Sequence, residues 1–560
     1  MPAATIAPGC LLPVTCNSVV GMCNSVVGMR TGRLASLLVA TSLVLTVAAC
    51  GAGDASGPTD ESLVIALSDE PENLNPIFGD IYGTIYGDKW PIFSGLVGYD
   101  QQLNPVPDLA AELPEITGTT VEVRLREGVT FHDGEPLTAE DVVFTYESIM
   151  DSSVATRLRD LLFDSLVEVR AVDEHTVEFT LDRVDPAFLD KLYIGIIPEH
   201  LLAGEDLNTA EFNVAPVGSG PFRFEEWRRG DRLVLSANPD WFGGEVASPS
   251  VTFVFVSDEN ARAAQLTSGA VDADASGLPP RTANTFDRDG YQVVGIPGDS
   301  LALILPTDNP TFADPRVREA IGLAINRQAI VDGVFDGRAE PVYTAIPPGH
   351  WAADSSISQP HDPEGALDLL ADAGWERDGD RLVDAGGQPL RINLAYSAGS
   401  DGDRGAALAV ESQLSDLGIE VELTSASHAA MGEWLAEGNA ALNRTGTVFD
   451  PDLDFLDMFH SSRIDDEEPF HNPAVLDDKE LDAALEAGRA TLDREQRVAA
   501  YQEVQRLVAA SGGWIFLVRP EHVFVVSDQV EGVAPQVGEG HLHGFSRGLL
   551  WNLHEWHVTG

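Results

Sequence analysis

Two acidic runs contain the residue types that bind calcium. The run from Asp272 to Gly277 has aspartates at its first and third positions and glycine at its sixth, as an EF-hand loop begins. Its twelfth position is Ala283 instead of a bidentate glutamate, and two prolines interrupt it. The run from Asp450 to Asp454 is followed by Phe455, where the loop needs glycine. We therefore expect no calcium loop at either run.

Histidines gather at the end of the chain, where neutral imidazoles this close together could bind a transition metal. No carboxylate or thiol is spaced with them as a closed site would require, so we favour a structural role on a terminal strand. We predict no metal and no cofactor. The four histidines are His541, His543, His554 and His557.

Other signatures of catalysis are missing from the sequence. There is no Gly-x-Ser-x-Gly elbow and no Gly-x-x-x-x-Gly-Lys phosphate loop. All four cysteines lie within the first 50 residues, which excludes a disulfide, a thiol catalyst or a cysteine-based zinc site after them. The 89 acidic and 34 basic residues give a net charge of −55, which repels phosphate and excludes nucleic-acid binding. We predict that the protein is not an enzyme.

The N-terminal region has the layout of a secretory signal. Residues 16–22 recur unchanged at 23–29, and we interpret residues 1–28 as an over-extended start. Residues 29–49 then form a complete signal peptide, with two arginines before an apolar run that ends in small residues. The apolar run, residues 34–49, is shorter than the ~20 residues that a spanning helix needs.

The signal ends in Val-Ala-Ala-Cys, which resembles the lipobox of bacterial lipoproteins, whose cysteine is diacylated. Cys50 is therefore the predicted lipidation site. Residues 50–61 have linker composition and form the expected tether between the membrane and the folded part. Two acyl chains anchor a protein stably where one does not, so we expect a cell-membrane, extracytoplasmic location.

Strand-like and helix-like patterns alternate from residue 62 to the end, which predicts an α/β fold. Short apolar or alternating runs predict strands at 63–67, 121–125, 177–181, 390–394, 419–423, 514–518 and 523–526. Capping residues predict helix starts at Thr138, at Asp314-Pro315 and at Asp362-Pro363. Further helical patterns cover about 404–417 and 481–510.

Residues 126–142, which include His132-Asp133-Gly134, resemble the signature of the family 5 extracytoplasmic solute-binding proteins of ABC importers. This group includes dipeptide-, oligopeptide- and nickel-binding receptors. The resemblance covers about residues 62–560. Further motifs follow in the family's order, at 74–76, 216–222, 238–241, 268–272, 314–321 and 370–375.

The resemblance implies a bilobed periplasmic-binding-protein-like fold of type II (cluster C), in which crossing strands hinge two α/β lobes. The first lobe would contain a discontinuous domain and an inserted domain, residues 93–212. The second lobe would be residues 301–516. The discontinuous domain would comprise residues 61–92, 213–300 and 517–560. His132-Asp133-Gly134 would be a turn, with glycine for positive φ.

The resemblance also implies the ligand-binding residues. In peptide-binding relatives an aspartate before a proline receives the ligand ammonium, and Asp450 occupies the matching place, with Asp452 as the alternative. Arg404 matches an arginine that binds the ligand carboxylate. The remaining candidates are the strand-pairing residues Thr445, Gly446 and Thr447, the adjacent Phe449, and the aromatic residues Tyr82, Tyr86 and Trp90. The family's Gly-Trp and a preceding acidic residue are replaced here by Thr-Gly-Thr.

The sequence thus predicts a monomeric, lipid-anchored receptor that captures a short peptide between two lobes and delivers it to an ABC permease and its ATPase. A nickel or metal-chelate receptor of the same fold is the first alternative. A secreted hydrolase is the second alternative, and it would turn its substrate over where a receptor returns its ligand unchanged.

Overall fold

The computed structural model describes residues 62–559, except 79–90, 157, 160–162, 446–448, 465–467, 469 and 539–547. All described residues belong to one compact unit, which begins at Gly57. Within this part of the chain, no helix is both long and apolar enough to cross a membrane. Several predicted site residues lie outside the described residues, namely Cys50, Tyr82, Tyr86, Trp90, Gly446, Thr447, His541 and His543.

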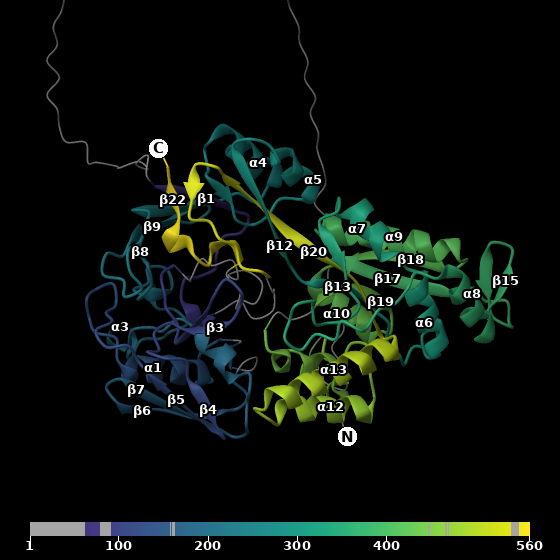
Figure 1. Cartoon of the computed structure of the whole chain (residues 1–560), viewed down its shortest axis with the longest axis horizontal. Helices are drawn as coiled ribbons and strands as arrows, with labels where there is room; N and C mark the ends of the chain where they lie inside the picture. The colour runs from purple at the N-terminus through teal and green to yellow at the C-terminus, as the bar shows by residue number, and fades with distance from the viewer. Residues whose placement is uncertain are drawn as a thin grey trace, which may run out of the picture. The chain divides into compact units, whose positions relative to one another are not determined.

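A large mixed sheet forms the frame of the molecule (Figure 1). Its strands in spatial order are β18 (Glu420–Ala426), β17 (Arg391–Ser397), β19 (Ala440–Thr445), β13 (Ser300–Ile304), β20 (Trp514–Ser527), β11 (Ala273–Asp274), β1 (Leu63–Leu67), β10 (Ser250–Phe255), β9 (Arg232–Ala237) and β8 (Phe222–Arg228). Two further strands, β12 (Tyr291–Pro297) and β14 (Ala339–Pro341), also pair with β20. The predicted α/β class is confirmed.

Smaller sheets lie apart from this frame. A four-stranded sheet consists of β4 (Glu115–Thr117), β5 (Thr120–Arg124), β7 (Thr176–Leu181) and β6 (Leu166–Asp173). Three two-stranded sheets are β2 (Val97–Tyr99) with β3 (Pro105–Pro107), β15 (Glu376–Asp378) with β16 (Arg381–Val383), and β21 (Val530–Glu531) with β22 (His557–Val558).

The helices are short to medium in length. They are α1 (Ala139–Met150), α3 (Glu199–Leu202), α4 (Glu259–Ser268), α5 (Pro280–Ala283), α6 (Pro315–Ala324), α7 (Arg327–Val334), α8 (Pro363–Asp372), α9 (Asp401–Asp416), α10 (His428–Ala436), α11 (Phe455–Phe459), α12 (Lys479–Arg489) and α13 (Arg494–Ser511). The predicted caps are present, since Asp314 accepts the Arg316 N–H at 2.9 Å and Asp362 accepts the Gly365 N–H at 2.9 Å.

The helical pattern predicted over about 481–510 is two helices rather than one. Helix α12 ends at Arg489, and α13 begins after Asp493. Asp493 accepts the Gln496 N–H at 3.0 Å as an N-cap. An aspartate side chain competes for backbone N–H groups and therefore favours a helix start over a helix interior.

Strand β20 links two groups of strands. Its residues 514–518 pair with β13, and its residues 521–527 pair with β12. Only Gly298 and Asp299 separate β12 from β13, so two antiparallel segments pass from one group to the other (Figure 1). These are the crossing strands that the family resemblance implies, and their presence is confirmed.

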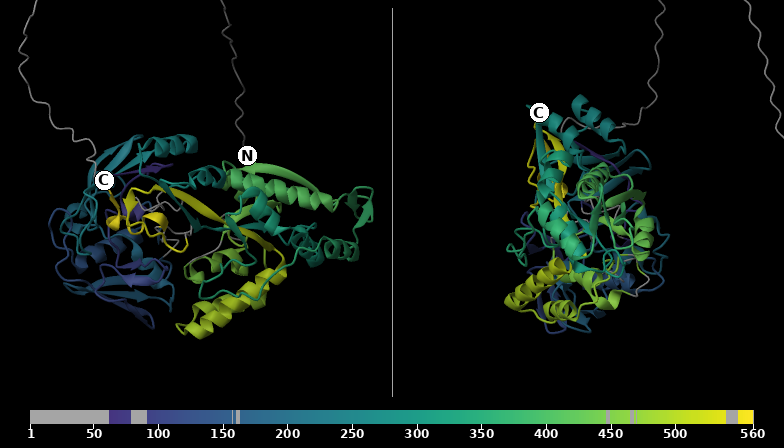
Figure 2. Two further views of the ribbon diagram at one scale, coloured as in Figure 1. Left: turned by 45° about the horizontal axis from the view of Figure 1, so that its top comes forward. Right: turned by 90° about the vertical axis from the view of Figure 1, so that its right-hand side faces the viewer.

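Buried apolar residues form separate cores around these strands. On β13, Leu301 and Leu303 face one cluster, and Ala302 and Ile304 face another, as alternation along a strand requires. Helices α6 to α9 cover the first face and α10 to α13 the second (Figure 2). A third cluster contains residues of β1, β5, β7 and α1. The predicted domain boundaries stay a prediction.

The His132-Asp133-Gly134 segment is a turn that holds a neighbouring loop. Gly134 has a φ of +94°, as expected. The His132 ring donates from Nε2 to the Gly220 carbonyl oxygen at 3.0 Å, and its Nδ1 accepts the Gly218 N–H at 3.2 Å. Burial lowers the pKa of His132 to about 4, so the ring stays neutral in these contacts above that pH.

The loop held by His132 passes so close to another segment that it needs glycine. A Cβ at Gly218 would overlap the carbonyl oxygen of Ile92. Gly218→Ala should therefore lower the free energy of unfolding by about 1–3 kcal/mol, the usual cost of overpacking. Gly333→Ala in α7 is the matched control, because no atom lies within 4 Å of its Cβ position. Urea unfolding of both variants checks this, and equal stabilities would contradict it.

Candidate functional site

Strand β19 leads into the predicted ligand-binding segment and has an open edge. It pairs with β13 from Ala441 to Thr445. On its other side it pairs with β17 only at Ala440 and Ala441. Among the described strands, none pairs with that side from Leu442 to Thr445. This edge has the geometry to accept an added peptide strand.

The side chain of Thr445 points into the protein rather than along this edge. Thr445 is buried, and its hydroxyl lies 3.4 Å from the sulfur of Met458. Thr445 would therefore contact a ligand through its backbone N–H and C=O groups. Gly446 and Thr447 lie outside the described residues.

Asp450 is held by an arginine of α13. The Arg497 Nη2 lies 2.5 Å from Asp450 Oδ1, and Nη1 lies 2.6 Å from Oδ2. Both side chains are less than a tenth exposed, which makes this a buried bidentate ion pair. Burial by itself lowers the pKa of Arg497, but the hydrogen bonds and the charge of Asp450 raise it above its usual range. A ligand ammonium at Asp450 would compete with Arg497.

Asp450 also contacts a segment far away in the sequence. Its backbone N–H donates to Asp190 Oδ2 at 3.2 Å, and the Tyr99 hydroxyl donates to Asp190 Oδ1 at 2.5 Å. The Tyr99 ring packs on Phe449, with centroids 5.0 Å apart. Burial, and after it the charge of Asp450, raises the pKa of Asp190 to about 7. Residues from the predicted inserted domain thus meet the predicted ligand-binding loop.

Asp452, the alternative candidate, is also paired. Its Oδ1 lies 3.2 Å from Arg489 Nε, and its side chain is 7% exposed. Burial raises the pKa of Asp452 to about 7, although the Arg489 charge opposes this. Both predicted acidic ligand residues therefore have arginine partners from the α12–α13 pair.

His350 fixes the backbone of the same loop. Its Nε2–H donates to the Phe449 carbonyl oxygen at 2.8 Å, and its Nδ1 accepts the Ala352 N–H at 3.2 Å. Burial lowers the pKa of His350 to about 4. The neighbouring Trp351 ring lies under the Arg494 guanidinium at 3.6 Å. No motif in the sequence marks His350, Tyr99 or Asp190 for this role.

Arg404 does not join this cluster. It is exposed on α9. The preceding residue, Asp403, is buried and accepts hydrogen bonds from Arg444 of β19 at 2.8 and 3.1 Å. A role for Arg404 in binding a carboxylate stays a prediction.

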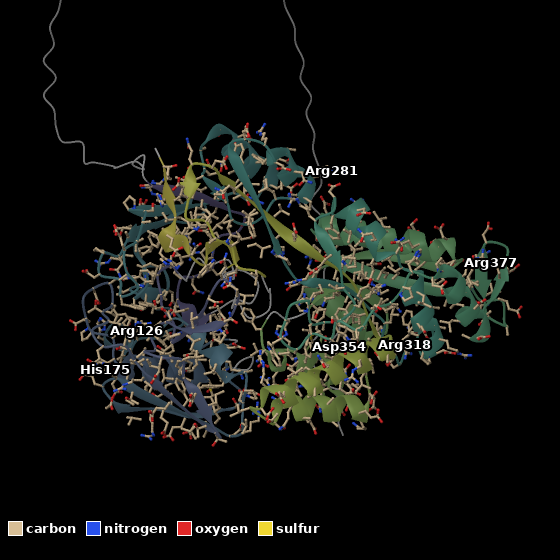
Figure 3. The ribbon with its side chains drawn as sticks, viewed as in Figure 1. Arg126, His175, Arg281, Arg318, Asp354 and Arg377 are labelled. Carbon is tan, nitrogen blue, oxygen red and sulfur yellow. The ribbon has the colours of Figure 1, made fainter. Side chains whose placement is uncertain are left out.

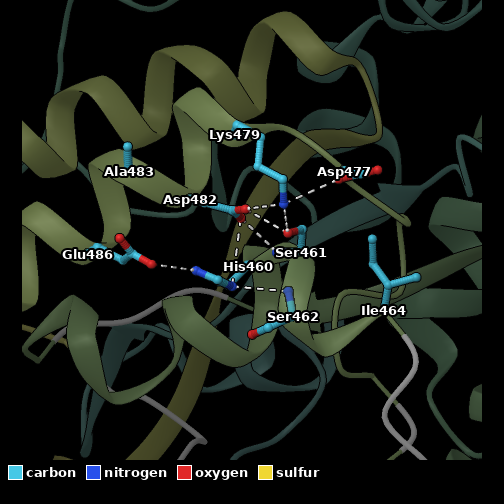
Figure 4. Close-up of a pocket in the computed structure, with 9 residues that line it drawn as sticks. All are labelled: His460, Ser461, Ser462, Ile464, Asp477, Lys479, Asp482, Ala483 and Glu486. Atoms are coloured by element: carbon cyan, nitrogen blue, oxygen red, sulfur yellow. Dashed lines mark hydrogen bonds and ion pairs between the residues drawn. The ribbon is translucent and has the colours of Figure 1, made fainter.

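A hollow of about 650 Å³ beside α12 resembles a hydrolase site in its residue types, but its contacts differ (Figure 4). Ser461 Oγ donates to Asp482 at 2.6 Å and accepts from Lys479 Nζ at 2.7 Å. The Nε2 of His460 lies 3.5 Å from Glu486 instead of facing that hydroxyl. The arrangement lacks the serine-to-histidine hydrogen bond that activates a nucleophile.

Three described residues that were considered as metal ligands, Asp272, Asp274 and His554, have other partners. Asp274 accepts from Arg262 Nε at 2.6 Å, and Asp272 accepts the Val64 N–H at 2.7 Å. The His554 ring packs on Trp241, with centroids 4.8 Å apart. Within the described ranges, no three His, Cys, Asp or Glu side chains are placed to hold a metal ion.

Comparison with known proteins identifies relatives that match most of the chain. Residues 104–466 match the family described as "Bacterial extracellular solute-binding proteins, family 5 Middle". Protein XP55 of Streptomyces lividans is 35% identical over 524 residues, which cover 91% of this chain and 94% of that protein.

Two solved structures have the same fold. The oligopeptide-binding protein AppA from Bacillus subtilis, in complex with a nonapeptide, has a TM-score of 0.71 and 27% identity. NikZ from Campylobacter jejuni, in complex with Ni(L-His), has a TM-score of 0.75 and 26% identity. Each match covers 89% of this chain and 99% of the other. The predicted periplasmic-binding-protein-like α/β fold is confirmed.

The buried pair predicts a large stability effect at Asp450. Asp450→Asn leaves the Arg497 guanidinium buried without a counter-charge, so the free energy of unfolding should fall by about 3–5 kcal/mol. Asp368→Asn, at an exposed position of α8, is the matched control. Urea unfolding at neutral pH measures both. If Asp450→Asn lowers the free energy of unfolding by less than about 1 kcal/mol, as the loss of a surface ion pair would, the pair is not buried.

The contact of Asp190 predicts a pH effect. Its pKa of about 7 in the folded protein lies above the usual ~3.9 of an unfolded aspartate, so its protonated form favours folding. That contribution is complete below about pH 4 and is lost as pH rises through 7. Stability of the wild type relative to Asp190→Asn should therefore fall by more than about 1 kcal/mol between pH 4 and 7, because a shift of even one pKa unit corresponds to about 1.4 kcal/mol.

Chemical unfolding of the wild type and of Asp190→Asn across this pH range measures the difference in stability. His132 and His350 are present in both proteins, so their contributions cancel in this difference. Asp368→Asn provides the baseline. Parallel stability curves for the wild type and Asp190→Asn would refute a raised pKa at Asp190.

Proposed function

Since the chain belongs to the bacterial extracellular solute-binding proteins of family 5, we propose that it is the substrate-binding component of an ABC importer and captures a short peptide. The observation that carries this proposal is the open edge of β19 from Leu442 to Thr445, which leads into the loop around Asp450. An extended peptide can add to such an edge through main-chain hydrogen bonds. The similarity to AppA, solved with a nonapeptide, supports this choice.

In this proposal the ligand lies against both lobes. The edge of β19 and residues 445–449 contact it from one side. Tyr82, Tyr86 and Trp90 line the other side in this proposal. Ligand that contacts both lobes stabilises the closed state, and the permease recognises that state. Arg404 binds the ligand carboxylate, and the protein performs no covalent chemistry on its cargo.

Asp450 acts in this proposal mainly through its position in the loop. Its ion pair with Arg497, at 2.5 and 2.6 Å, compensates its charge and fixes the end of the loop. His350 fixes the Phe449 carbonyl in the same way. The family's Gly-Trp and a preceding acidic residue are replaced here by Thr-Gly-Thr, so we propose that backbone pairing contributes more to affinity than capture of the ligand ammonium does.

The protein would work outside the cytoplasmic membrane as a monomer. Cys50 carries the lipid anchor in this proposal, and residues 50–61 form the tether. The net charge of −55 keeps the folded part away from anionic headgroups. The partners are the ABC permease and its ATPase.

A nickel or metal-chelate receptor is the second candidate, because the solved NikZ complex with Ni(L-His) has the same fold. The two candidates differ in what binds. In a thermal-shift screen, a true ligand raises the melting temperature with its concentration, because it binds the folded state. We expect peptides of two to nine residues to do so and the nickel–histidine complex to have no effect. A shift with nickel–histidine alone would overturn the peptide proposal.

Calorimetry on Phe449→Ala tests the proposed location. Loss of the ring that packs on Tyr99 should weaken peptide binding by about 0.5–1.5 kcal/mol, the worth of an aromatic pair. Leu408→Ala, at an exposed position of α9, is the control and should leave affinity unchanged. Equal affinities of the two variants would place the ligand elsewhere.

A further inference from the structure

Buried arginines in this protein fall into two classes. Among the described residues, the arginines less than a tenth exposed are Arg262, Arg318, Arg327, Arg497 and Arg519. Three of them have a carboxylate within 4 Å: Arg262 with Asp274 at 2.6 Å, Arg497 with Asp450 at 2.5 Å, and Arg519 with Glu340 at 3.6 Å. No carboxylate of the described chain lies within that distance of Arg318 or Arg327.

Both of these arginines are held by neutral groups. Arg327 donates from Nε to the Phe516 carbonyl oxygen at 2.8 Å and from Nη2 to Gln359 Oε1 at 2.8 Å. Its guanidinium also lies 4.9 Å from the centre of the Tyr343 ring. Arg318 binds the carbonyl oxygens of Phe312, Ala313 and Ser511 at 2.5–3.1 Å. Among the described residues, none accepts a hydrogen bond from Nη1 of Arg327 or from Nη2 of Arg318.

The two arginines line the same cavity. It measures about 430 Å³ and lies between α6, the end of α13 and the start of β20. Figure 3 labels Arg318, which reaches the end of α13 at Ser511. Leu323, Ile357 and Phe516 supply apolar wall, and the exposed residues Glu319 and Ser358 lie where the cavity meets solvent.

The charge in this cavity is unbalanced. Burial of a cation without a counter-charge costs several kcal/mol, so the site gains when an anion enters. Burial lowers the pKa of Arg327 to about 10. Burial also lowers the pKa of Arg318, although the more distant charge of Asp314 raises it in part. Asp314 is itself bound by Arg316 at 2.5 Å. Asp314 does not line the cavity, and among the described residues that do, the one carboxylate is that of Glu319, which is exposed.

We propose that this cavity is a second ligand site, which binds a small organic carboxylate through Arg327 and Arg318. The guanidinium groups would receive the carboxylate oxygens, and the aliphatic part of the ligand would pack on Leu323 and Ile357. The apolar wall favours an organic anion over inorganic phosphate. This site is separate from the proposed peptide site, and peptide affinity does not depend on it.

Thermal unfolding of the full chain tests the proposal with sodium butyrate as the probe. Sodium chloride at equal ionic strength corrects for general screening of a chain with a charge of −55, and sodium phosphate represents inorganic oxyanions. The variants are Arg327→Gln, which removes the anion contact, and Glu319→Lys, which removes a repulsive charge at the mouth of the cavity. Glu376→Lys, at an exposed position of β15, is the matched charge control.

We expect butyrate to raise the melting temperature with saturation, more than either other salt does, and Arg327→Gln to lose this shift. If Arg327→Gln does not fold, Glu319→Lys provides the test of the site. It should lower the apparent Kd for butyrate several-fold, while Glu376→Lys leaves it unchanged. Equal, non-saturating shifts with all three salts would overturn the site. A stronger saturating shift with phosphate would overturn its assignment to organic carboxylates.

Discussion

The buried ion pair between Asp450 and Arg497 is the interaction on which the candidate site depends. It fixes the start of the 3-10 helix at Pro451–Leu453 against α13, so that the backbone of Asp450 can donate to Asp190. Phe449 then packs on Tyr99, and His350 holds its carbonyl oxygen. Loss of the pair would leave a buried charge and release the loop. One electrostatic contact thus positions the backbone that we propose contacts the ligand.

Compensation of buried charge explains much of the remaining structure. In a chain with 89 acidic residues, buried Asp274 meets Arg262 and buried Asp185 meets Lys191, whereas Asp190 has a raised pKa. Arg318 and Arg327 show the reverse case, because they are buried beside a cavity with no carboxylate in contact within the described chain. A buried charge without a counter-charge marks a place where a ligand can supply the counter-charge.

Local features of the fold could be predicted from the sequence, because their causes are local. The Asp314-Pro315 start of α6 and the alternating strand at 121–125 follow from a few adjacent residues. The site is different. The Asp190–Asp450 contact joins residues 260 positions apart, and nothing around Asp190 distinguishes it from the other acids. The resemblance named Asp450 as a ligand-binding residue but did not reveal its arginine, and Arg404 is exposed on α9.

We propose that this protein captures a peptide and returns it unchanged. Mass spectrometry of the small molecules released when the purified chain is denatured tests it most directly. We expect intact short peptides in near-stoichiometric amounts, held by the open edge of β19. A nickel chelate as the sole released ligand, or cleavage products that accumulate when a peptide is added to the native protein, would contradict it.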